Sequence, residues 1–336
     1  AKTYYFAGDF TDANGDHHDD ALWRATVEYD GLGWGSRVLP EALDNGSGFA
    51  VATNPHDLTV TSVPDGFGGT KERLFFFQTD EFGNGQIATI ELDHFGGSSG
   101  STGGDLGYQS FTGQEIRPWA DGVVLSGVDD LTGTNFVANW VDPDADGFFF
   151  PTVVVMETSS TIEQLIVDGQ GGLAFIEDDG ASDILWYYDG NAVWFVDQKF
   201  GEFTDLAFAG GQLGWIAESD AGAHQAVFGY DTATNTRFEA DTDEATGGIA
   251  GDGVSSMYHH VALAGALAFY GNDGSSQNLY LTNGTNLVQT DLTPYSPGDV
   301  LGGDWVGVGF DASVGRVVLE RIDSAGAQSV LYDNAL

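Results

Sequence analysis

A short unit of apolar runs separated by Asp-Gly or Asn-Gly pairs recurs in this chain, and it constrains the fold more than any other feature. Residues 171–198 read GGLAFIEDDGASDILWYYDGNAVWFVDQ, and residues 265–292 read GALAFYGNDGSSQNLYLTNGTNLVQTDL. Asp-Gly and Asn-Gly pairs favour two-residue hairpins, because both central residues can take positive φ. Each copy therefore predicts an antiparallel meander of strands.

Weaker copies of this unit fill most of the remaining chain, and a further strand precedes most of them. They lie at residues 3–39, 73–92, 135–155, 212–240 and 306–332. About seven units in 336 residues approach the repeat of ~40–50 residues that propeller blades require. We therefore expect an all-β fold: a single β-propeller domain over residues 1–336 with about seven four-stranded blades, although six or eight would fit almost as well. A β-sandwich, the main rival, needs no repeat.

Stacked blades bury both faces of each sheet, so the large side chains of the apolar runs are expected to form the core between blades. These side chains are Phe75, Phe76, Phe175, Trp186, Trp215, Phe269 and Tyr280. One apolar segment, residues 161–167 (TIEQLIV), fits a short helix and a strand equally well.

The two best copies resemble the ELK-type propeller repeats of large secreted bacterial proteins, including RTX-like proteins. The likeness lies in the apolar strand, the Asp-Gly turn, the Leu-Trp or Leu-Tyr strand and the second turn of residues 171–198 and 265–292. The resemblance implies the propeller fold. It implies little about chemistry, because such repeats serve many functions.

The charge balance limits the partners of this chain. It has 51 Asp and Glu against 10 Lys and Arg, a net charge of −41, which repels the phosphate backbone of a nucleic acid. No run approaches the ~20 apolar residues of a membrane span, so membrane insertion is not expected. The acidity is typical of a halophilic or marine surface, or of a calcium-loaded protein. With no cysteine, an extracellular chain must be held by its core, by metals or by ring closure, and we expect a secreted or cell-surface protein.

Two loops carry alternating oxygen ligands, the pattern that calcium prefers. Residues 142–147 read DPDADG and place the carboxylates of Asp142, Asp144 and Asp146 at every second position. The other loop, residues 12–20, resembles the calcium loop of FG-GAP-type propellers, although His17 stands where that loop usually has Gly. The matching positions are Asp12, Asn14, Asp16 and Asp20. Calcium is therefore the expected cofactor, and a solvated acidic turn is the alternative.

The sequence lacks the catalytic signatures of the P-loop and of His-Glu-x-x-His. In a propeller, however, the starts of the innermost strands converge on the central channel. Six polar residues at such starts could form a ring that holds a metal and activates water, although inert propellers also have polar channels. They are His56, Asp57, Glu163, Asp205, His259 and Asp304.

From these features we expect an extracellular, calcium-stabilised propeller that acts as a binding or surface-adhesion module. Its favoured partner is an extracellular glycan or another cell-surface component, because Trp beside Asp and Asn can stack on sugar rings. The tryptophans near turns or irregular stretches are Trp34, Trp119, Trp140 and Trp194, and ordinary packing is the alternative for most of them. Whether the protein is an enzyme is left open, and a protein without catalytic activity is favoured. The alternative function is a metal-dependent hydrolase or lyase with its site in the central channel.

Overall fold

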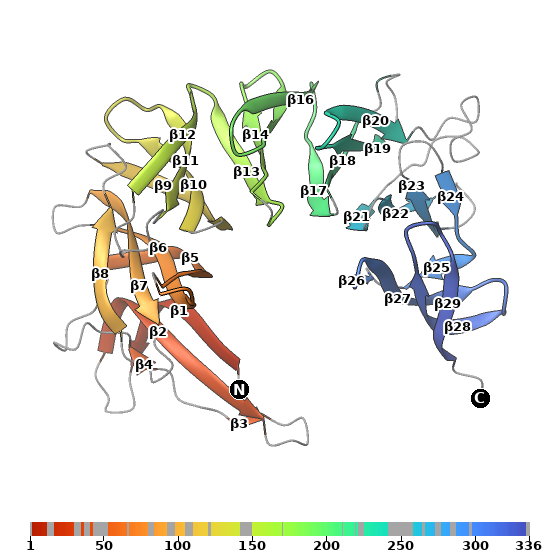
Figure 1. The fold of residues 1–336 in the computed structure, drawn as a ribbon, viewed down its shortest axis with the longest axis horizontal. Helices are drawn as coiled ribbons and strands as arrows, with labels where there is room; N and C mark the ends of the chain where they lie inside the picture. The colour runs from red at the N-terminus through yellow and green to blue at the C-terminus, as the bar shows by residue number, and fades with distance from the viewer. Residues whose placement is uncertain are drawn as a thin grey trace. The chain divides into compact units, whose positions relative to one another are not determined.

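The described residues of the computed structural model form strands and turns and no helix (Figure 1). The structure describes residues 2–11, 17–29, 35–36, 41–42, 53–65, 67–79, 84–92, 98–104, 110–119, 122–141, 150–169, 171–209, 211–218, 220, 225–240, 258–263, 266–272, 277–282, 287–295 and 298–333. No helix long and apolar enough to cross a membrane occurs among them. The expected all-β class is confirmed.

Within the described part of the chain, the strands group into seven sheets, six of four strands and one of five. The described strand pairings are antiparallel, and all but two join consecutive strands, as the repeated unit predicts; the exceptions are β2 with β4 and β25 with β27. The chain divides into two compact units, Ala1–Gly171 and Gly172–Leu336. The single domain over residues 1–336 therefore stays a prediction.

The first unit contains three complete sheets and one further strand (Figure 1). The first sheet comprises β1 (Lys2–Thr11), β2 (His17–Tyr29), β3 (Gly35–Ser36) and β4 (Glu41–Ala42). The second comprises β5 (Thr53–Pro64), β6 (Thr70–Thr79), β7 (Gly85–Leu92) and β8 (Ser98–Gly104). The third comprises β9 (Phe111–Trp119), β10 (Gly122–Asp129), β11 (Asn135–Val141) and β12 (Phe150–Thr158). The segment that fitted either a helix or a strand is strand β13 (Thr161–Val167).

The second unit continues with meanders of the same kind. It opens with β14 (Leu173–Asp178), β15 (Asp183–Tyr188) and β16 (Val193–Lys199). The next sheet comprises β17 (Thr204–Ala209), β18 (Gln212–Glu218), β19 (Gln225–Asp231) and β20 (Thr236–Ala240). It is followed by β21 (Tyr258–Leu263), β22 (Ala266–Asn272), β23 (Gln277–Thr282) and β24 (Leu287–Gln289). The last sheet comprises β25 (Leu292–Pro294), β26 (Asp299–Leu301), β27 (Asp304–Asp311), β28 (Arg316–Ile322) and β29 (Gln328–Asp333).

The Asp-Gly turn between β14 and β15 lies where the sequence predicts a hairpin, but its geometry differs. Four residues, not two, connect the strands, and of these only Gly180 has positive φ, at 81°. Asp179 stays at negative φ because its Oδ1 accepts the backbone N–H groups of Ala181 and Ser182, both at 2.8 Å. This local side-chain bonding replaces the expected two-residue turn.

The predicted burial of the large apolar side chains is confirmed at all positions but one. Trp186 is only partly buried, whereas the other six are fully or almost fully buried: Phe75, Phe76, Phe175, Trp215, Phe269 and Tyr280. Trp119 and Trp140 are also buried, which rules them out as surface stacking platforms, while Trp194 is 41% exposed. Trp34 lies outside the described residues.

In the first unit, the second and third sheets share one continuous apolar core. Phe75 of β6 meets Trp140 of β11 edge to face, with 5.9 Å between ring centroids, and Phe111 of β9 meets Phe136 of β11 at 5.7 Å. Strands β10 and β11 are buried on both faces apart from Val128. This packing fixes the ends of the two sheets against each other, where the candidate site lies.

Candidate functional site

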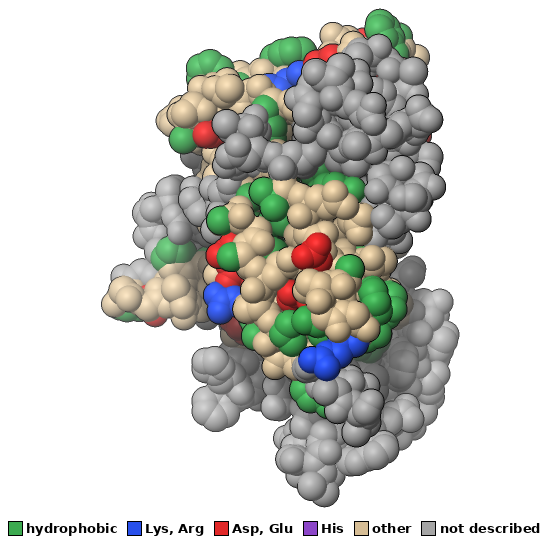
Figure 2. All heavy atoms as spheres, turned by 90° about the vertical axis from the view of Figure 1, so that its right-hand side faces the viewer, with side chains coloured by type: hydrophobic (Ala, Val, Ile, Leu, Met, Phe, Trp, Pro, Cys, Tyr) green, Lys and Arg blue, Asp and Glu red, His purple; other side chains and the backbone are tan. Residues whose placement is uncertain are grey.

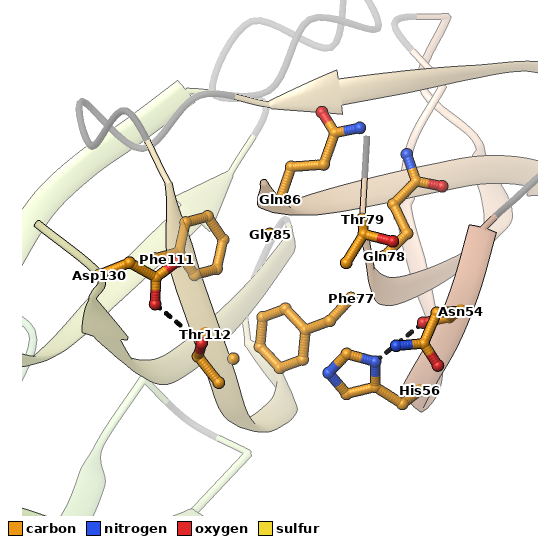
Figure 3. Close-up of a pocket in the computed structure, with 11 residues that line it drawn as sticks. Asn54, His56, Phe77, Gln78, Thr79, Gly85, Gln86, Phe111, Thr112 and Asp130 are labelled. Carbon is orange, nitrogen blue, oxygen red and sulfur yellow. Dashed lines mark hydrogen bonds between the residues drawn. The ribbon is translucent and has the colours of Figure 1, made fainter. Parts of the chain in front are cut away.

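A cavity of about 180 Å³ lies in the first unit, where the second sheet meets the third (Figure 3). Its volume is below the ~300–1,000 Å³ typical of drug-sized sites, so it suits a small molecule. Eleven of the described residues line it: Asn54, His56, Phe77, Gln78, Thr79, Gly85, Gln86, Phe111, Thr112, Gly113 and Asp130.

Two aromatic rings form the apolar wall of the cavity. Phe77 of β6 and Phe111 of β9 are buried and meet edge to face, with ring centroids 6.0 Å apart and an interplanar angle of 81°. Both rings belong to the core shared by the two sheets, so their positions are fixed from behind. Figure 3 shows His56 and Asp130 on opposite sides of this pair.

Two glycines allow the sheets to approach closely at the cavity. A Cβ on Gly113 would lie 2.4 Å from the Phe77 ring, and a Cβ on Gly85 would lie 1.8 Å from the carbonyl oxygen of Phe111. Contacts this short do not occur in folded proteins, so any larger residue would displace the ring or the backbone. The absence of a side chain at these two positions therefore shapes the site.

His56 is held in the cavity by a distorted stretch of β5. The strand register shifts on both sides of His56, and the flanking Asn54 and Asp57 take positive φ, at 51° and 49°. Asn and Asp enter this left-handed region more readily than other residues with a Cβ, but such a backbone still costs of order 1–3 kcal/mol. The imidazole contacts Phe77, its partner across the ladder, with 5.6 Å between the rings.

The hydrogen bonds of His56 define its tautomer. Its Nδ1 lies 3.0 Å from the carbonyl oxygen of Asn54, which can only accept, so Nδ1 carries the proton. In the neutral ring, Nε2 is then an acceptor. In its neutral form, His56 therefore presents an acceptor at the cavity.

Asp130 is positioned by hydroxyl groups of the neighbouring strand. Thr112 donates from Oγ1 to Oδ1 at 2.8 Å, and Ser110 donates from Oγ to Oδ2. Ser110 also accepts the N–H of Gly85 at 3.2 Å, which links the second sheet to the third. The carboxylate therefore has a fixed orientation at the edge of the cavity.

The turn that carries Asp130 is itself fixed by Asp129. The hydroxyl of Thr132 donates to Oδ2 of Asp129, and the backbone N–H of Leu131 donates to Oδ1 at 3.1 Å. These two bonds hold the pKa of Asp129 below its usual range, so the carboxylate that orders this turn is ionised at neutral pH. The position of Asp130 thus depends on a preorganised hairpin.

Gln78 carries a buried acceptor that does not face the aromatic wall of the cavity. Its side chain is 8% exposed, and within the described residues its Oε1 has no hydrogen-bond partner. Gln78 follows Phe77 on β6, so its side chain points to the opposite face of the strand, as Figure 3 shows.

Of the six residues proposed for a central metal ring, the first unit contains His56, Asp57 and Glu163. His56 lines the cavity, whereas Asp57 is exposed. Asp57 lies near Glu115 of β9. The pKa of Glu115 is raised by burial and further by Asp57, while Arg117, 3.0 Å from Glu115, lowers it. Glu163 is exposed on β13.

The other three residues of the expected ring lie in the second unit. Asp304 is paired with Arg321, so its carboxylate already has a cation. Asp205 lies in β17 and His259 in β21, and their side chains are outside the described ones. Among the described residues, no group of three or more acidic or His side chains could hold a metal. That the six meet as one metal site therefore stays a prediction.

The expected calcium loops fall outside the part of the chain that the structure describes. This holds for Asp142, Asp144, Asp146, Asp12, Asn14 and Asp16. Asp20 lies in β2, where only the backbone is described. Calcium binding, secretion and the resemblance to ELK-type repeats stay predictions.

No protein family matches the sequence, and no curated protein matches it. Among solved structures, the chain is similar to puromycin hydrolase, with 16% identity, a TM-score of 0.43, and 99% of this chain and 53% of that chain covered. It is similar to the β-propeller domain of the Trilobed protease from Pyrococcus furiosus, with 11% identity, a TM-score of 0.42, and 100% and 93% covered. A structure from a study of two prolyl endopeptidases gives 13% identity, a TM-score of 0.45, and 98% and 48% covered. The chain spans about half the length of the first and third of these proteins.

The expected role as a glycan-binding adhesion module is wrong. The similar structures carry the names of hydrolytic enzymes, namely puromycin hydrolase, acylaminoacyl peptidase and prolyl endopeptidase, and these names do not point to surface attachment. Fold likeness at 11–16% identity transfers no activity to this chain, because one fold serves many functions. The function is therefore argued from the cavity.

Proposed function

We propose that the seven sheets are the blades of one β-propeller and that the cavity at His56 binds a small polar molecule. The blade arrangement is supported by the burial of both faces of β10 and β11, which a sheet achieves only when other sheets cover it on two sides. This proposal concerns a small molecule held inside the domain and not adhesion to a surface.

The last sheet supports the same arrangement. Its Val308, Phe310, Val317 and Tyr332 are exposed, and Phe310 pairs directly with Val317 across the ladder. Figure 2 shows the side of the molecule on which this sheet lies, with hydrophobic side chains among acidic and basic ones. A ring of blades would cover such a face. A closed chain of 336 residues should then give a radius of gyration of about 20 Å by small-angle X-ray scattering, and a much larger value would contradict the ring.

The observation that carries the binding proposal is the strained backbone on either side of His56. Positive φ at Asn54 and Asp57 is energetically unfavourable, and this backbone conformation places the imidazole of His56 at the cavity. Strain of this kind collects at ligand sites, where the surrounding structure maintains it.

The arrangement favours binding over hydrolysis at this cavity. Ser110 donates to Asp130 directly, and His56 donates from Nδ1 to a backbone carbonyl. In a Ser-His-Asp triad the imidazole stands between the hydroxyl and the carboxylate. Here the hydroxyl groups of Ser110 and Thr112 donate directly to Asp130, so His56 activates neither of them.

The test is a screen of small polar molecules by saturation-transfer NMR with the wild-type chain. Compounds that bind in the cavity should lose binding in His56→Ala, while Glu72→Gln, an exposed position on the same sheet, should bind as the wild type does. Circular dichroism confirms that the variants are folded. Compounds whose binding is equal in all three proteins would show that the cavity is not the site.

A further inference from the structure

We infer that the cavity takes a small organic cation, a primary ammonium group attached to an apolar body; this inference rests on the proposed function. The first reason is the charge of the lining. None of the eleven described lining residues is Lys or Arg, and Asp130 places a carboxylate at the edge. An anion would meet only repulsion from that carboxylate.

The second reason is that the cavity presents unused acceptors. Each oxygen of Asp130 accepts one hydroxyl and retains capacity for another donor. On the opposite side of the aromatic pair, Nε2 of His56 is an acceptor when the ring is neutral. An ammonium group has three donors and no acceptor, so it matches the carboxylate oxygens of Asp130 better than a hydroxyl group does.

The third reason is the aromatic wall. Phe77 and Phe111 give an apolar surface against which the body of the ligand can pack, and aromatic faces attract cations. The chain already uses a Phe ring in this way, because Lys199 and Arg237 lie 4.3 and 4.5 Å from the ring centre of Phe228. The net charge of −41 also raises the local concentration of cations around the protein.

The experiment compares three molecules of nearly equal size: benzylamine, benzyl alcohol and benzoate. Dissociation constants are measured by NMR titration at fixed ionic strength near pH 7. We expect benzylamine to bind about tenfold more tightly than benzyl alcohol, as one charge-assisted hydrogen bond provides, and benzoate not to bind.

Two variants and one control separate the cavity from general attraction of cations to an acidic protein. Asp130→Asn should weaken benzylamine about tenfold and leave benzyl alcohol unchanged. Glu72→Gln removes the same charge at an exposed position of the second sheet and should change neither. Gly113→Ala, whose added Cβ meets the Phe77 ring, should weaken both ligands.

The outcomes distinguish this inference from the proposed function. If benzyl alcohol binds as tightly as benzylamine and Gly113→Ala weakens both, the cavity is a binding site but the preference for a cation is wrong. If benzylamine binds equally to the wild type, Asp130→Asn and Gly113→Ala, the attraction is nonspecific and the inference fails. If none of the three binds and the screen with His56→Ala also finds no cavity ligand, the proposed function fails with it.

Discussion

Arg237 holds Asp220 through both terminal nitrogens, with Nη1 2.8 Å from Oδ2 and Nη2 3.0 Å from Oδ1. Lys199 donates to the same carboxylate at 2.5 Å, and Asp197 lies 3.1 Å from Arg237. Both cations lie against the ring of Phe228. Two positive and two negative side chains thus balance one another and tie β16 to β20 in the second unit.

This network predicts that Asp220→Asn lowers the free energy of unfolding by about 1 kcal/mol at pH 7, after allowance for solvent around the half-exposed carboxylate. Arg237 and then Lys199 lower the pKa of Asp220 from 3.8 to about 2. The stabilisation is therefore fully present above pH 3.8 and is lost as the pH falls through 2. Urea unfolding at several pH values measures it. Glu202→Gln, an exposed control, should have little effect, and an equal loss in both variants would contradict the network.

Glu320 predicts the opposite dependence on pH. Burial raises its pKa from 4.5 to about 7, and Asp311 and Asp291 add to this, while Gln328 opposes it. Folding therefore favours the protonated form, and this contribution to stability falls as the pH rises from 4.5 to about 7. The free energy of unfolding of Glu320→Gln, measured relative to that of the wild type, should therefore increase between pH 4.5 and pH 8. The increase should reach up to about 3 kcal/mol. A difference between the two proteins that does not change with pH would show that Glu320 is ionised at little cost.

Gly113→Ala is expected to destabilise the first unit by about 1–3 kcal/mol, because its Cβ would overlap the buried Phe77 ring. Gly201→Ala is the matched control, since its added Cβ meets nothing within 4 Å and its φ is not positive. Chemical unfolding of the two variants measures the difference. Equal stability of Gly113→Ala and Gly201→Ala would mean that the Phe77 ring, and with it the cavity wall, can shift at little cost in free energy.

Calcium binding at Asp142, Asp144 and Asp146 predicts that millimolar calcium raises the melting temperature of the wild type at fixed ionic strength. Calcium at a concentration of 100 times the dissociation constant of the site adds about 2.7 kcal/mol to the free energy of unfolding. Asp144→Ala should lose most of this rise, whereas Asp299→Ala, an exposed Asp of β26, should keep it. Identical melting of the wild type in calcium and in chelator would exclude a stabilising site.

The sequence predicted strands and turns well, because an apolar run bounded by Gly and Asp carries the information locally. It gave the wrong turn type at Asp179, since the decisive bond is one between a carboxylate and two backbone N–H groups. Of the candidate site residues, His56 was nominated as the start of an inner strand, and it does line a cavity. The metal ring expected around it stays a prediction, because its six residues divide between the two units.

The rest of the cavity could not be predicted, because it depends on how two sheets meet. Phe77 belongs to the run LFFFQT, which indicates a buried strand and does not show that this ring forms the wall of a cavity. Asp130 is one of 51 acidic residues, and only the approach of Ser110 and Thr112 distinguishes it. Gly85 and Gly113 are two of 49 glycines, and their role appears only when the facing residues are known.

The close approach of Gly113 to Phe77 has an evolutionary consequence. The two residues share one volume, although they belong to different sheets and lie far apart in the sequence. A larger side chain at position 113 is compatible with the fold only when position 77 becomes smaller, so substitutions at the two positions are not independent. Among descendants of this sequence, we expect the two positions to change together or not at all.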